Sequence, residues 1–183
     1  MMIRCTMTAA ALAALISLFT LAGCDGSEPA ASQSQATPLP ASALLQQSPG
    51  EPTPIDQLRK TAAEGDEVVI RAVVGGQEKP FVSGRAIMTV VDATLPKSCG
   101  VSPDDPCTTP WDYCCTQRDD LMPHLATVQL VDAEGKPLQI NLIGSKQLEP
   151  LDTIIVRGTV GPRPDPSMLV INAQSLYVEP GTP

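Results

Sequence analysis

The stretch that decides the fold is Thr127–Val160, TVQLVDAEGKPLQINLIGSKQLEPLDTIIVRGTV. Within it, Leu138–Leu142 alternates apolar and amide side chains at every residue, which is the period of a half-buried strand. Ile154–Val160 also alternates, as a strand with one solvated face does. The polar residues 134–136 separate the first two apolar runs and predict a turn. The stretch therefore predicts a strand, a turn, a strand, a crossover and a strand, as in the middle of a small closed barrel.

An internal echo of this stretch places another strand. GDEVVIRAVVG (Gly65–Gly75) and LDTIIVRGTVG (Leu151–Gly161) share, in register, an aspartate, three β-branched residues, an arginine, a small residue and a final glycine. Two strands with the same pattern of inward and outward residues, and a small residue at the same bend, suit neighbours that curl around one core. We therefore expect these two strands to be adjacent.

The remaining segments complete an all-β chain. Further strands are expected over Gly84–Asp92 and Leu169–Val178, which brings the total to five or six. Thr53-Pro54-Ile55-Asp56 has the cap, proline and acid of a helix start, and predicts one short helix before Gly65. No long helical period follows, so the class is all-β with small helices.

This order of elements resembles the OB-fold, a five-stranded Greek-key barrel. The resemblance covers Gly65–Val178 and implies an OB-like domain over residues 54–183, with residues 95–121 as a cysteine-rich insertion. Many OB barrels bind nucleic acid, but this chain has a formal net charge of −8 and only one Trp, two Tyr and two Phe. Such a chain repels phosphates and has few rings on which bases could stack, so nucleic-acid binding is the least favoured alternative.

The N-terminal region has the features of an export signal. Met1–Gly23 combines Arg4 with an apolar core too short for a membrane span, and it ends in Leu21-Ala22-Gly23-Cys24. That ending resembles the lipobox of bacterial lipoproteins, which implies cleavage before Cys24 and its acylation with chains such as palmitate. The alternative is an ordinary signal peptide. The lipobox implies a chain anchored to the bacterial cell envelope, with its domain facing the periplasm or exterior.

Residues 24–53 are rich in Pro, Ser, Ala and Gln and show almost no alternation. A segment of this composition cannot bury enough apolar surface to order itself. The composition therefore predicts a disordered tether between Cys24 and the folded domain.

The insertion carries four of the six cysteines: Cys99, Cys107, Cys114 and Cys115. Clustered cysteines in even number, in an exported chain, favour disulfides. A bond between the neighbours Cys114 and Cys115 would be strained. Two crossed pairings stay open: Cys99 with Cys114 and Cys107 with Cys115, or Cys99 with Cys115 and Cys107 with Cys114.

The alternative for these four cysteines is a metal-binding or thiol-redox site, with His124 as a further ligand. Zinc ligand pairs usually have two or more residues between them, which the adjacent Cys114 and Cys115 do not. The primary expectation is therefore no metal and no cofactor.

The motif Pro110–Cys115, PWDYCC, together with Gly84-Arg85-Ala86 and Val91-Asp92, resembles an uncharacterised family of bacterial lipoproteins. Within this motif Trp111 and Tyr113 are candidate partner contacts, since such rings dominate interface energies. The alternative is that Trp111 covers the cysteine cluster and one end of the barrel.

The sequence offers little for catalysis. His124 is the single histidine, and neither a nucleophile elbow nor a phosphate-binding loop is present. We expect a non-enzymatic envelope protein that presents its acidic barrel and stapled loop to a protein or glycan partner.

Overall fold

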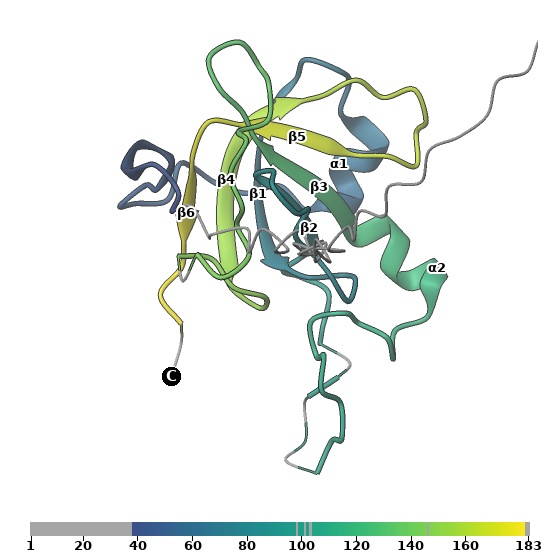
Figure 1. Ribbon diagram of the computed structural model, residues 1–183. Helices are drawn as coiled ribbons and strands as arrows, with labels where there is room; N and C mark the ends of the chain where they lie inside the picture. The colour runs from purple at the N-terminus through teal and green to yellow at the C-terminus, as the bar shows by residue number, and fades with distance from the viewer. Residues whose placement is uncertain (1–37, 98, 101, 103, 146, 182–183) are drawn as a thin grey trace, which may run out of the picture. The chain divides into compact units, whose positions relative to one another are not determined.

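In the described part of the chain, six strands form one sheet that closes into a barrel (Figure 1). The computed structural model describes residues 38–97, 99–100, 102, 104–145 and 147–181. The strands are β1 (Glu67–Val74), β2 (Ile87–Asp92), β3 (Leu125–Leu130), β4 (Thr153–Val160), β5 (Val170–Ala173) and β6 (Leu176–Val178). Their order is β1-β2-β3-β5-β4-β6, and β1 also pairs with β4. Five strands therefore close the barrel, and β6 continues outside it along β4.

The pairing of β1 with β4 confirms the prediction drawn from the repeated segments. The two strands run antiparallel, with Glu67 opposite Thr159 and Val73 opposite Thr153. In both strands the arginine is exposed, and Ile70 and Val156 face each other with no exposed surface. The shared pattern of the two segments therefore places them side by side around one core.

The barrel closes where β4 meets β5 at Gly158. A Cβ atom on Gly158 would lie 2.4 Å from the carbonyl oxygen of Asn172, so only glycine allows the two backbones to approach this closely. On its other side β5 runs parallel to β3, with Thr127 opposite Val170. This order, with one parallel pair, confirms the small all-β, OB-like barrel expected from the sequence.

Two predicted strands differ from the structure. Leu138–Leu142 is not a strand, although Val131 forms a bridge with Pro137. Pairing with the end of β3 is limited to this bridge and to a hydrogen bond from the Leu138 amide to the Leu130 carbonyl at 2.9 Å, which is too short a ladder to form a strand. Leu169–Val178 is two strands, because β5 and β6 pair with different parts of β4.

The segment before the barrel corrects the predicted tether. Residues 1–37, including the signal, Cys24 and the first part of the 24–53 tether, lie outside the described residues. The rest of that tether packs on the barrel: Leu39 and Ala43 are buried, the latter in the 3-10 helix η1 (Ala41–Ala43). The amide of Leu45 donates to the carbonyl of Leu176 at 2.8 Å. Prediction of a free linker over residues 38–53 was therefore wrong, because its few apolar residues belong to the core.

The predicted short helix is present as α1 (Ile55–Thr61), and it packs against β2 and β3. Its buried face is formed by Ile55 and Leu58. Its N-terminus is capped by the buried carboxylate of Asp92 at the end of β2, which accepts from the amide of Ile55. None of the helices among the described residues is long and apolar enough to cross a membrane.

Candidate functional site: the cysteine loop

The cysteine loop, residues 95–121, leaves the end of β2 and projects from the barrel (Figure 1). It returns to β3 through α2 (Arg118–Leu121) and the 3-10 helix η2 (Met122–His124). This loop is the largest addition to the barrel, and loops held by a rigid scaffold commonly carry binding and catalytic residues.

Trp111 attaches the loop to the barrel. Its carbonyl oxygen accepts from the amide of Gly76 at 2.7 Å, and its indole Nε1 donates to the carbonyl of Glu78 at 3.0 Å. A Cβ atom on Gly75 would lie 2.4 Å from the same Trp111 oxygen. The pair Gly75-Gly76, directly after β1, is therefore the site at which the loop contacts the barrel, and we call it the seat of the loop.

Tyr113 anchors the loop from within. Its side chain is 1% exposed, and its backbone φ is 58°, a left-handed conformation that few tyrosines adopt. Burial, followed by the nearby Cys99, raises the pKa of the Tyr113 hydroxyl. The prediction that Tyr113 contacts a partner was wrong, because a buried ring cannot reach a partner.

Two aspartates, each two residues before a cysteine, fix the local turns of the loop. Asp105 accepts from the amide of Cys107 at 2.9 Å, and Asp112 accepts from the amide of Cys114 at 2.8 Å. The other carboxylate oxygen of Asp105 accepts from the amide of Gly100 at 2.8 Å. Asp-x-Cys occurs at both positions of the sequence, and this repetition is a signal for the aspartates that the sequence analysis did not use. These side-chain turns set the direction in which the two cysteines leave the backbone.

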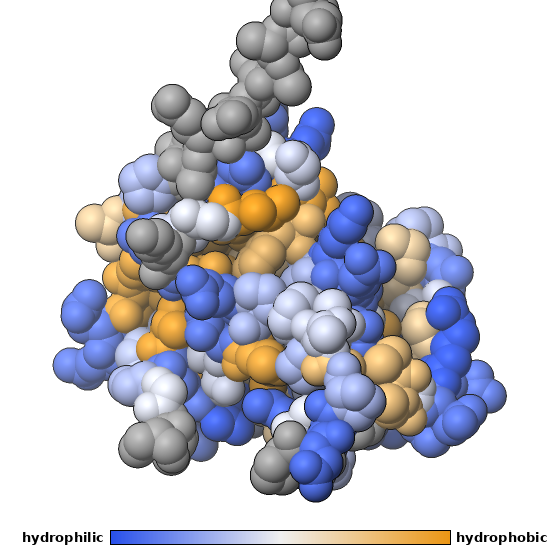
Figure 2. Space-filling model, turned by 60° about the horizontal axis from the view of Figure 1, so that its bottom comes forward, coloured by the Kyte–Doolittle hydropathy of each residue, from blue (hydrophilic) through white to orange (hydrophobic). Residues whose placement is uncertain are grey.

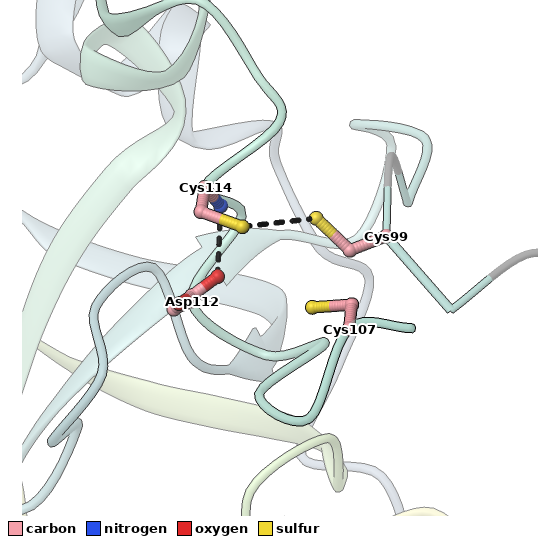
Figure 3. A group of neighbouring side chains, drawn as sticks. All are labelled: Cys99, Cys107, Asp112 and Cys114. Carbon is pink, nitrogen blue, oxygen red and sulfur yellow. Dashed lines mark hydrogen bonds between the residues drawn. The ribbon is translucent and has the colours of Figure 1, made fainter. Parts of the chain in front are cut away.

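Three of the thiols and one carboxylate converge. The sulfurs of Cys99, Cys107 and Cys114 and an oxygen of Asp112 all lie within 4.8 Å of one another (Figure 3). The sulfurs of Cys99 and Cys114 are 3.6 Å apart. Cys99 is buried, Cys107 and Asp112 are half-buried, and Cys114 is exposed, so this Cys3Asp cluster has one buried and one open side.

The four cysteines of the loop, all of them described, form no disulfide in this structure. Cys115 is exposed, and its sulfur lies 3.9 Å from that of Cys114. The contact between Cys99 and Cys114 corresponds to the first of the two crossed pairings. The disulfides stay a prediction.

His124 does not join the cysteines in a common ligand set. Its ring lies with Asp56 and Asp92, whose ligand atoms and its own are within 4.8 Å of one another. The Nδ1 atom of His124 is buried and makes no hydrogen bond among the described residues. Asp92 is already engaged as the cap of α1 and by Thr94, which gives this second group a structural role. The four-cysteine and His124 set considered from the sequence is therefore replaced by Cys99, Cys107, Cys114 and Asp112.

The cluster shifts the acidity of its members. The side chain of Asp112, followed by Cys99 and Cys115, raises the pKa of the Cys114 thiol far above its ordinary value. The pKa of the Cys115 thiol is also raised, chiefly by the side chain of Cys99. Partial burial works to raise the pKa of Asp112, but hydrogen bonds from the Cys114 amide, Thr109 and the Cys114 thiol together hold it below its ordinary value. The pKa values of Asp112 and Cys114 therefore shift in opposite directions, because the carboxylate accepts hydrogen bonds from Cys114.

An apolar hollow of about 520 Å³ lies beside the point where Trp111 meets the barrel. Figure 2 looks onto this end of the barrel and shows apolar residues gathered among hydrophilic ones. The apolar lining of the hollow comes from Pro80, Phe81, Trp111, Ile143, Leu148 and Pro150. Ile143 is 48% exposed and the neighbouring Val82 43%, two of the three large exposed hydrophobic residues in the described part of the chain. Glu78, Lys79 and Glu149 also line the hollow.

No protein-family model, curated protein or solved structure matches this chain.

Proposed function

We propose that this chain is a lipid-anchored, non-enzymatic protein of the bacterial envelope that binds a protein partner at the apolar hollow beside its cysteine loop. The observation that carries the proposal is the hollow itself, where Trp111 and Ile143 offer apolar surface at the base of the loop. Exposed apolar surface with a polar rim is typical of an interaction site. The motif Leu21-Ala22-Gly23-Cys24 supplies the anchor.

The chemistry of the hollow defines its partner. Its volume suits one or two large apolar side chains, and the aromatic ring of Trp111 is the kind of group that anchors interfaces. Glu78 and Glu149 outnumber Lys79 on its lining, and the whole chain is acidic. The partner is therefore a protein segment with an exposed apolar side chain beside a basic residue.

Site-specific photocrosslinking in intact cells tests this proposal. A photoreactive residue at Ile143 should give one discrete crosslinked product, and the Trp111→Ala change should abolish it. The same photoreactive residue at Lys136, exposed in the turn after β3, is the matched control and should give none. A product that also forms at Lys136, or that survives Trp111→Ala, contradicts the proposed site. Loss of membrane attachment on Cys24→Ala tests the anchor separately.

A further inference from the structure

We propose that Cys99, Cys107, Cys114 and Asp112 bind one zinc ion, which holds the cysteine loop in shape in place of disulfides. The inference is independent of the partner proposed above, because it concerns the interior of the loop. It rests on the convergence of four donor atoms from three separate parts of the loop (Figure 3).

The distances suit tetrahedral coordination. A zinc–sulfur bond of about 2.3 Å places the corners of a tetrahedron about 3.8 Å apart. The sulfurs of Cys99 and Cys114 are 3.6 Å apart, and no pair of the four donor atoms exceeds 4.8 Å. Small side-chain rotations therefore bring all four donors to bonding distance of a common centre, without moving the barrel.

The donor types select the metal. Three sulfurs favour zinc or Cu(I) over magnesium and calcium, and the carboxylate oxygen of Asp112 favours zinc over Cu(I). Four protein ligands leave no open position, which is the arrangement of a structural zinc site. A disulfide network would use all four cysteines and would leave Asp112 without a role at the sulfurs.

The charge of the loop also attracts a cation. The loop has five aspartates and only two basic residues, Lys97 and Arg118. Asp105 and Asp112 hold the backbone amides of Cys107 and Cys114, so the backbone at both ligands is fixed before a metal arrives. Pre-positioned ligands lower the ordering cost of binding.

The first measurement uses the full chain, extracted from its native membrane in detergent without chelator or reductant. Elemental analysis should give about one zinc per chain, and denaturation with a chelator should expose four reactive loop thiols. Absence of zinc together with oxidised loop cysteines overturns the proposal in favour of disulfides.

Two matched variants separate the ligands from their neighbour. Cys107→Ser removes a proposed ligand, whereas Cys115→Ser removes a thiol outside the set. Loss of a group that only supports a ligand costs about 10- to 100-fold in metal affinity, so Cys107→Ser should weaken zinc binding by at least that factor. Cys115→Ser should bind zinc as the unaltered chain does. Equal zinc affinity in the two variants overturns the proposed ligand set.

Asp112→Asn keeps an oxygen that accepts from the Cys114 amide and removes only the charge. It should therefore keep the turn, monitored by the emission of Trp111, and lose zinc affinity. With Co²⁺ as the probe, the unaltered chain should show an intense thiolate-to-cobalt band that Cys107→Ser weakens. Unchanged zinc affinity in Asp112→Asn, or a cobalt complex without thiolate bands, contradicts the proposal.

Discussion

Gly75→Ala should release the cysteine loop from the barrel. The new Cβ atom would lie 2.4 Å from the carbonyl oxygen of Trp111, far inside the roughly 3.5 Å at which nonbonded heavy atoms pack. The oxygen must move by about 1 Å. That shift breaks its hydrogen bond from Gly76 and strains the one from the indole to Glu78. Two such bonds contribute about 1–3 kcal/mol to docking of the loop.

Trp111 reports this change directly, because it is the only tryptophan in the chain. In Gly75→Ala its emission should shift to the red, and acrylamide should quench it more strongly. The free energy of unfolding of the barrel should fall by much less than the free energy of docking of the loop, because the loop contributes few residues to the core. Gly181→Ala is the matched control, since a Cβ there meets no atom within 4 Å. Emission and quenching that are unchanged in Gly75→Ala would refute the proposed seat of the loop.

Other predictions test the barrel and its surface. Gly158→Ala should lower the free energy of unfolding by about 2–3 kcal/mol, because its Cβ would clash with Asn172 across the β4–β5 closure; chemical denaturation that shows no loss would contradict this contact. Leu39→Ala should cost about 2–3 kcal/mol in the same assay, since Leu39 is 3% exposed. A truly free tether would give no change there. The full chain, with its net charge of −8, should not be retained on single-stranded DNA at low salt, and retention would revive nucleic-acid binding.

The sequence predicted strand pairing best where two segments share the same alternation of buried and exposed residues. The shared pattern of Gly65–Gly75 and Leu151–Gly161 predicted the β1–β4 pair, because the in-and-out order of both strands is set by one core. The same periodicity failed at Leu138–Leu142, since alternation reports burial and does not report how far the pairing with a neighbouring strand extends. Pairing across the barrel decides that, and it depends on residues far apart in the chain.

On the N-terminal side of the domain, the composition wrongly predicted a free tether. Residues 38–53 are rich in Pro, Ser and Gln, yet Leu39 and Ala43 are buried against the barrel. A few apolar residues are enough to dock a short segment when the surface that receives them already exists, and composition alone does not reveal that surface.

The candidate site was predicted in part. The sequence placed four cysteines in one loop, but it could not show which sulfurs face each other. Asp112 was missed as a cluster member because its spacing to Cys114 is that of a turn, and zinc motifs seldom use such a pair. Burial of Tyr113 was also missed, because the sequence pattern predicts neither its left-handed backbone nor its 1% exposure.

The central claim is that a lipid-anchored chain carries a loop shaped by a metal. Mass spectrometry of the full chain from its native membrane tests it most directly, first under conditions that keep it folded and then in denaturant without reductant. We predict acyl chains on Cys24, one zinc ion lost on denaturation, and four reduced loop cysteines. An unacylated chain with two disulfides and no metal would contradict the account.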